Sequence, residues 1–90
     1  MRELLRTNRF KRDWKRMNKR GAQARKLSEV LELLAADQPL PERCRPHKLV
    51  GEWAGFWECH IEPDWLLVYD LDDPKVLTLV ATGSHADLFR

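Results

Sequence analysis

Three histidines and one aspartate are the residues whose chemistry and placement first point to catalysis. His47 lies in a proline-rich stretch, Asp64 follows His60 by four residues, and His85 stands near the end of the chain. Imidazole accepts and donates protons near neutral pH. In RNA cleavage, the ribose 2′-OH loses a proton as it attacks the adjacent phosphorus, and the leaving 5′-oxygen gains one. Several histidines with a carboxylate meet both needs without a metal ion.

Other catalytic chemistries fit the sequence less well. The histidines show no HxH, HxxxH or HExxH spacing, so we expect no metal site and no cofactor. Ser84 lacks the GxSxG turn that presents a serine nucleophile. Cys44 and Cys59 lack CxxC spacing, and we expect packed free thiols rather than a zinc site or a disulfide.

Charge is distributed very unevenly along the chain. Residues 1–27 hold eleven basic and two acidic residues, a formal charge of +9, whereas the remainder carries −7. A block of this density is typical of a surface that binds a polyanion, although charge runs often mark only a solvated helix face. We expect no salt-bridging carboxylates at i+4 positions along this block, which favours contact with a polyanion.

Length and composition predict one soluble globular domain that spans residues 1–90. Hydrophobic residues make up 43% of the chain, which is enough for a core. No apolar run approaches the ~18 residues of a membrane span, and the N-terminus lacks the apolar stretch of a signal peptide. We therefore expect a cytoplasmic protein without a membrane partner.

The first half of the chain predicts a strand and two helices. Residues 3–7 suit a short strand. Apolar residues at i, i+4 and i+7 predict a helix over residues 9–20, with Asn8 as its N-cap and Gly21 ending it. A second helix is predicted over residues 23–36. Three prolines then predict a loop over about residues 37–48.

The second half of the chain predicts strands. The aromatic-rich segment Trp53–Cys59 suits one strand, with a bulge at Gly55, and residues 65–71 and 76–81 suit two more. The tail, residues 84–90, is expected to be irregular or a single turn. This order predicts an α+β fold, in which an N-terminal strand and a two-helix hairpin pack on a small, mainly antiparallel sheet. Loops and strand ends of such a sheet can bring the histidines and Asp64 to one surface.

Three segments of the C-terminal half carry long, ordered motifs. Residues 60–69 read HIEPDWLLVY, residues 46–60 read PHKLVGEWAGFWECH, and residues 82–89 read TGSHADLF. They resemble the H-[IV]-x-x-D-W-[IL]-L-[IV]-Y, HxLxGxWxGxxxxH and TG[TS]HxxLF motifs of the YafQ-like branch of the RelE/ParE toxin superfamily. The resemblance implies a RelE-like fold and a ribosome-dependent endoribonuclease that cuts messenger RNA in the ribosomal A site. It also implies a cognate antitoxin, usually a ribbon-helix-helix protein.

The resemblance implies roles for individual residues. His47, His60, Asp64 and His85 match the family's catalytic positions. We expect Asp64 or His60 to accept the 2′-OH proton, His85 to protonate the leaving oxygen, and His47 to steady the charge. Matching aromatic positions, expected either to stack on a base or to pack in the protein, are Trp65 and Phe89.

One departure from the resemblance bears on the basic residues. RelE-type relatives carry an arginine just before the last TG motif, where it can neutralise the scissile phosphate, but this chain has Ala81. The cation must then come from elsewhere, and the candidates are a protonated histidine, Lys48, Arg43 and Arg45. The residues expected to contact ribosomal RNA phosphates are Arg9, Lys11, Arg12, Lys15, Arg16, Lys19 and Arg20.

Two other functions remain open at this point. A ParE-like toxin that binds gyrase would share the fold but would not need His60, Asp64 and His85. A plain nucleic-acid-binding module would use the basic segment but would leave the histidine motifs unexplained.

Overall fold

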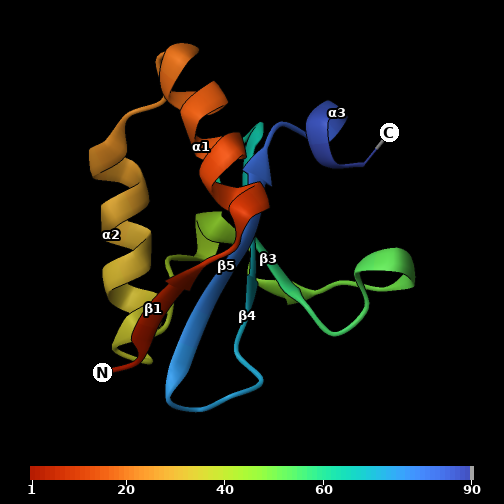
Figure 1. Cartoon of the computed structure of the whole chain (residues 1–90). Coiled ribbons are helices and arrows are strands. Elements are labelled where there is room, and N and C mark those ends of the chain that lie inside the picture. The colour runs from red at the N-terminus through yellow and green to blue at the C-terminus, as the bar shows by residue number, and fades with distance from the viewer. Residues whose placement is uncertain (90) are drawn as a thin grey trace.

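The computed structural model describes residues 1–89 and contains a five-stranded sheet with two long helices on one face (Figure 1). The strands are β1 (Glu3–Arg6), β2 (His47–Lys48), β3 (Trp57–Glu62), β4 (Trp65–Asp70) and β5 (Val76–Gly83). Their spatial order is β1-β5-β4-β3-β2. Only the β1–β5 pair among these is parallel, so the sheet is mainly antiparallel and the predicted α+β fold is confirmed.

Helices α1 (Asn8–Lys19) and α2 (Ala24–Ala35) form the predicted hairpin. The N-cap of α1 is Thr7 and not Asn8, because the Thr7 hydroxyl accepts a hydrogen bond from the Phe10 amide and also donates one to the Val80 carbonyl. A hydroxyl one residue earlier thus satisfies a free amide of the first turn and ties α1 to β5. Gly21 follows the helix with a φ of +93°, as expected for the residue after a helix end.

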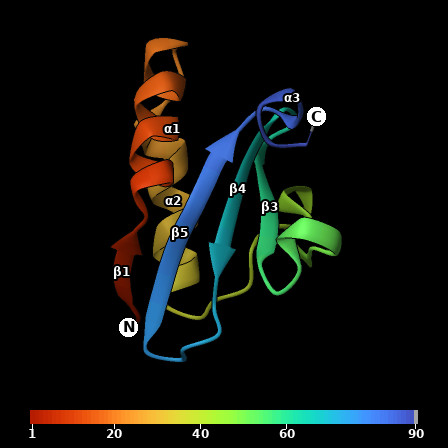
Figure 2. The same ribbon diagram turned by 45° about the vertical axis from the view of Figure 1, so that its right-hand side comes forward.

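The two faces of the sheet pack against different partners. One face meets α1 and α2 in the larger core, which includes Phe10, Leu27, Leu67 and Leu79. The opposite face carries a smaller apolar patch of Leu66, Val68, Ala81 and Leu88, partly covered by side chains that precede β3. Figure 2 shows the helices on one side of the sheet and the segment before β3, with the C-terminal turn, on the other.

The region before β3 differs most from the sequence prediction. The expected loop contains a 3-10 turn at Glu42–Cys44 and the two-residue strand β2. The strand expected from Trp53 starts at Trp57, because Gly51–Trp53 forms a second 3-10 turn and Gly55, with a φ of +95°, lies in the connection that follows. The bulge lies between His60 and Glu62 instead of at Gly55.

The C-terminal elements lie close to their predicted positions. Strand β4 ends one residue early, at Asp70, whereas β5 continues through the TG motif to Gly83. A single turn, α3 (His85–Leu88), follows, and the last residue of the predicted tail, residue 90, lies outside the described residues. Within residues 1–89 no helix combines the length and apolar character needed to cross a membrane.

Candidate functional site

The three histidines come from three separate elements and meet on the sheet face opposite α1 and α2. His47 lies in β2, His60 in β3, and His85 is the first residue of α3. The ring centroids of His60 and His85 are 5.6 Å apart, with the ring planes tilted by 54°. In the sheet, His60 pairs with Leu66, a member of the smaller apolar patch, which places the ring on that face. The convergence expected from the sequence is therefore present.

Asp64, in the turn between β3 and β4, holds His85 by two hydrogen bonds. Its Oδ1 atom accepts one from the His85 backbone amide at 2.9 Å and faces the ring Nδ1 at 2.6 Å. These two bonds, of which the backbone bond has the larger effect, hold the pKa of the Asp64 carboxyl below its usual value. The carboxylate thus joins the β3–β4 turn to the C-terminal turn and orients the imidazole.

A buried carboxylate that the sequence analysis missed links the other two histidines. Glu58 is 5% exposed, and its Oε1 atom lies 3.5 Å from His47 Nε2 and 3.6 Å from His60 Nε2. A signal for it existed, since residues two apart in a strand point to the same face, so a strand that presents His60 also presents Glu58. The titratable side chains therefore run in a row from His47 through Glu58, His60 and His85 to Asp64.

The hydrogen-bond partners assign one tautomer to all three neutral rings. His47 Nδ1 lies 2.8 Å from the Arg45 carbonyl oxygen, and His60 Nδ1 lies 3.3 Å from that of Pro63. A carbonyl only accepts, so each Nδ1 carries the proton, as His85 Nδ1 does toward the Asp64 carboxylate. Each neutral ring then keeps its Nε2 lone pair free to take a proton. Neighbouring rings of this kind can act as a proton acceptor and a proton donor on one substrate.

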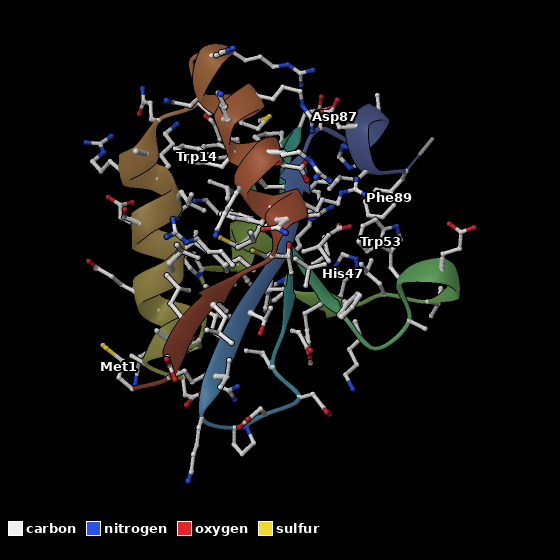
Figure 3. The ribbon with its side chains drawn as sticks, viewed as in Figure 1. Met1, Trp14, His47, Trp53, Asp87 and Phe89 are labelled. Atoms are coloured by element: carbon white, nitrogen blue, oxygen red, sulfur yellow. The ribbon has the colours of Figure 1, made fainter. Side chains whose placement is uncertain are left out.

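The two aromatic residues matched by the motif have different surroundings. Trp65 is 2% exposed, stacks on Trp14 with centroids 6.0 Å apart, and donates its indole N–H to Thr82 Oγ1. The enclosed ring favours the second expectation for Trp65, packing in the protein, over stacking on a base. Phe89 is 38% exposed and meets Trp53 edge-on, with centroids 6.1 Å apart. Figure 3 shows Phe89, Trp53 and His47 on the same side of the molecule.

The candidate phosphate-binding cations lie on the β2 side of the cluster. Lys48 Nζ is 5.9 Å from the centroid of the Trp57 ring. Arg43 and Arg45 line a pocket of about 430 Å³ that His60 also lines. Ala81 is fully buried in the smaller apolar patch, so β5 contributes no charge at that position.

Some cations of the basic helix α1 pair with a carboxylate, which the sequence analysis did not expect. Asp13, 5% exposed, accepts hydrogen bonds from Arg9 Nε at 3.3 Å, from Arg16 at 3.3 Å and from the Thr82 backbone amide at 3.1 Å. The expectation of no i+4 partner is wrong for Arg9, because a carboxylate that packs against β5 needs cations around it. Within residues 1–89, the cations of α1 without an acidic partner are Lys11, Arg12, Lys15 and Lys19.

The end of α1 anchors the turn that carries His85. Asp87 closes a capping box with Ser84 and accepts a 2.7 Å hydrogen bond from Arg20, while Arg16 lies 3.8 Å away. The Arg20 hydrogen bond, aided by that of the Ser84 amide, holds the pKa of the Asp87 carboxyl well below its usual range. Arg16 and Arg20 therefore position the C-terminal turn, in addition to any contact they make with RNA.

Both cysteines are free and buried, as expected. Burial raises the pKa of the Cys44 and Cys59 thiols, which keeps them protonated and unreactive. Among the described residues, no group of three or more histidine, cysteine and acidic side chains is arranged to hold a metal ion.

Comparisons with known proteins agree on one group. Residues 2–90 match the family described as the bacterial toxin of type II toxin-antitoxin systems, YafQ. The chain is 38% identical over 89 residues to the mRNA interferase toxin YafQ of Escherichia coli K12, covering 98% of this chain and 96% of that protein. The structure resembles the toxin in the E. coli DinJ-YafQ toxin-antitoxin complex (TM-score 0.89, 38% identity, 99% and 98% covered). It also resembles a metal-bound toxin from Helicobacter pylori (TM-score 0.92, 38% identity, 99% and 100% covered).

Proposed function

Because the chain belongs to the YafQ family of bacterial type II toxins, we propose that it is an mRNA interferase, an endoribonuclease that cleaves messenger RNA. The structural observation that supports this assignment is the row of three histidines and two carboxylates on one sheet face. Neither a gyrase-binding toxin nor a plain nucleic-acid-binding module needs such a row.

The cleavage step uses two of the histidines as a proton acceptor and a proton donor. His60 Nε2 accepts the proton of the ribose 2′-OH as that oxygen attacks phosphorus, and the Glu58 carboxylate stabilises the charge that the ring gains. His85, protonated at Nε2, gives its proton to the departing 5′-oxygen. The products are a 2′,3′-cyclic phosphate and a 5′-hydroxyl end. Asp64 is less suited to be the base, because its lowered pKa makes it a weak proton acceptor.

We infer that this chemistry needs no metal ion. Two proton-transferring rings and the cations beside them supply the functions that a metal would otherwise supply. The metal-bound relative from H. pylori makes chelation an informative test. Cleavage at an unchanged rate in excess EDTA supports the inference, and cleavage that is lost in EDTA and restored by added metal overturns it.

Ribosomes and an antitoxin are the proposed partners. The cations of α1 that lack an acidic partner among residues 1–89 form a surface suited to ribosomal RNA phosphates, and we propose that the ribosome binds the toxin there while the histidines on the other sheet face meet the codon in the A site. The DinJ-YafQ complex supports a cognate antitoxin for this chain, and we propose one of the ribbon-helix-helix type.

The experiment that tests the function is single-turnover cleavage of messenger RNA on programmed ribosomes. We expect His85→Gln to lose about 10²–10⁴-fold in rate, since the leaving oxygen then lacks its proton donor. Asp64→Asn should fall at least tenfold, while Asp72→Asn, an exposed turn carboxylate, serves as the matched control. If His85→Gln cleaves at the wild-type rate, the assignment is wrong. Growth arrest with DNA damage and intact messages would indicate gyrase binding instead.

A further inference from the structure

The proposed reaction places extra negative charge on the phosphate at its transition state, so a cation must lie against it. The histidine row itself carries two carboxylates, Glu58 and Asp64, and Ala81 places no charge on the same sheet face. A fixed cation for this charge must therefore reach the face from an element other than β5.

Helix α1 brings Arg9 to this face. The guanidinium carbon of Arg9 lies 5.2 Å from the centroid of the Trp53 ring. Trp53 meets the exposed ring of Phe89 and packs on the apolar patch that contains Ala81. We propose that Arg9, stacked on Trp53, binds the scissile phosphate of the RNA and fills the role that Ala81 leaves vacant, an inference that rests on the proposed function.

The Arg9 side chain is held so that its outer edge is available. Arg9 Nε donates to the buried carboxylate of Asp13, which also accepts from the Thr82 amide, three residues before His85. The two terminal nitrogen atoms make no hydrogen bond to any of residues 1–89, and the side chain is 44% exposed. A guanidinium fixed by one edge and by an aromatic face presents a pair of donors that matches two phosphate oxygens.

The other cations near the histidines occupy different places. Lys48 lies over Trp57, and Arg43 and Arg45 line the pocket beside His60 together with the Lys26–Glu62 ion pair. Lys48 pairs with Trp57, whose ring packs on the larger core, so its side chain lies on the sheet face that carries the helices. Arg43 and Arg45, beside His60, suit a phosphate next to the scissile one. Arg9 shares its aromatic contact with Phe89, the exposed ring expected to meet a base, so one nucleotide can bind both groups.

The test separates a contact with the scissile phosphate from a contact with ribosomal RNA. Arg9→Gln is compared with Arg25→Gln, which removes the same charge from an exposed position of α2. Ribosome affinity is measured first, with a message that is 2′-deoxy at the cleavage position. The single-turnover rate is then measured at saturating toxin. We expect the Arg9→Gln rate to fall about 10²-fold, the effect of removing one transition-state donor, with affinity within about threefold of wild type.

Three outcomes would overturn the inference. The first is an equal cleavage rate for Arg9→Gln and Arg25→Gln. The second is a loss of ribosome affinity in Arg9→Gln with an unchanged rate at saturation, which would make Arg9 a contact to ribosomal RNA. The Arg9→Lys variant keeps a cation beside Asp13, so it serves as a control for misfolding, and it should recover only part of the cleavage rate. The third outcome is full recovery in Arg9→Lys, which would exclude the paired-donor geometry. A wild-type chain that cleaves nothing would contradict the proposed function itself.

Discussion

The shared carboxylate of Glu58 offers a sharp test of the histidine row. Glu58→Gln keeps the shape of the side chain but removes its charge, so neither His47 nor His60 gains a stabilising partner when it takes a proton. Each ring keeps its Nδ1 hydrogen bond to a backbone carbonyl, so the orientation of both rings should survive. The variant therefore changes charge stabilisation more than geometry.

The expected magnitude follows from the burial of the two contacts. The His60 side chain is 18% exposed, and its Nε2 atom lies 3.6 Å from Glu58 Oε1, which is beyond hydrogen-bond distance. When the ring takes a proton, the contact therefore acts as an ion pair worth about 1 kcal/mol. The His47 side chain is 50% exposed and solvent screens its contact to about 0.5 kcal/mol. Together they amount to about 1.5 kcal/mol, which corresponds to about a tenfold loss in rate.

The assay is single-turnover cleavage on programmed ribosomes, with thermal unfolding as a check of folding. Glu52→Gln, an exposed glutamate in the turn before β3, is the matched control. We expect Glu58→Gln to melt within a few degrees of wild type and to cleave about tenfold more slowly. A Glu58→Gln variant that is folded and cleaves at the wild-type rate would refute the role of the carboxylate and of His60 as the base.

Three further predictions follow from the same structure. Because the pKa of Asp87 in the folded protein lies below its usual value of 3.8, this carboxylate contributes stability that is present above about pH 4 and is lost as the pH falls further. Asp87→Asn should therefore make the unfolding free energy less dependent on acid pH, and identical acid unfolding curves for the variant and wild type would contradict this. Trp65→Ala should lower the free energy of unfolding by about 3–5 kcal/mol, while Trp65→Phe should keep most of the cleavage rate. A Trp65→Ala variant that is fully stable but inactive would instead indicate a direct role in RNA binding. Reversing the charges at Lys11, Lys15 and Lys19 should weaken ribosome binding and lower its salt dependence by about 0.7–0.9 per lost phosphate contact, and an unchanged salt titration would exclude α1 as the RNA surface.

Much of the fold could be predicted because its periodic signals are strong. The apolar spacing of α1 and α2 reflects one buried face on each helix, whereas the continuous apolar run of β4 reflects burial on both faces of the sheet. Strand β2 was missed because two residues are too few to show a period, and its pairing with β3 depends on partners distant in the sequence. The start of β3 was misplaced because Gly51 and Gly55 turn the chain inside an aromatic-rich segment.

The candidate site was only partly predictable for a related reason. The motifs located His47, His60, Asp64 and His85, but the burial of Trp65 depends on Trp14 and Thr82, which no local pattern connects to it. Ion pairs between residues distant in the sequence could not be predicted either. The pairing of Arg20 with Asp87, and of Asp13 with the Thr82 amide of β5, appears only when α1 packs against the end of β5. The pair of Arg9 and Asp13 is different, because its i,i+4 spacing on α1 could have been read from the sequence.

The measurement that tests the central claim most directly is a map of RNA 5′-hydroxyl ends in cells after a short pulse of expression. The account predicts new 5′-hydroxyl ends inside translated codons, in frame, which disappear when His85→Gln is expressed instead. New ends without a reading frame, new ends that carry 5′-phosphates, or a growth arrest that leaves messages intact would contradict it.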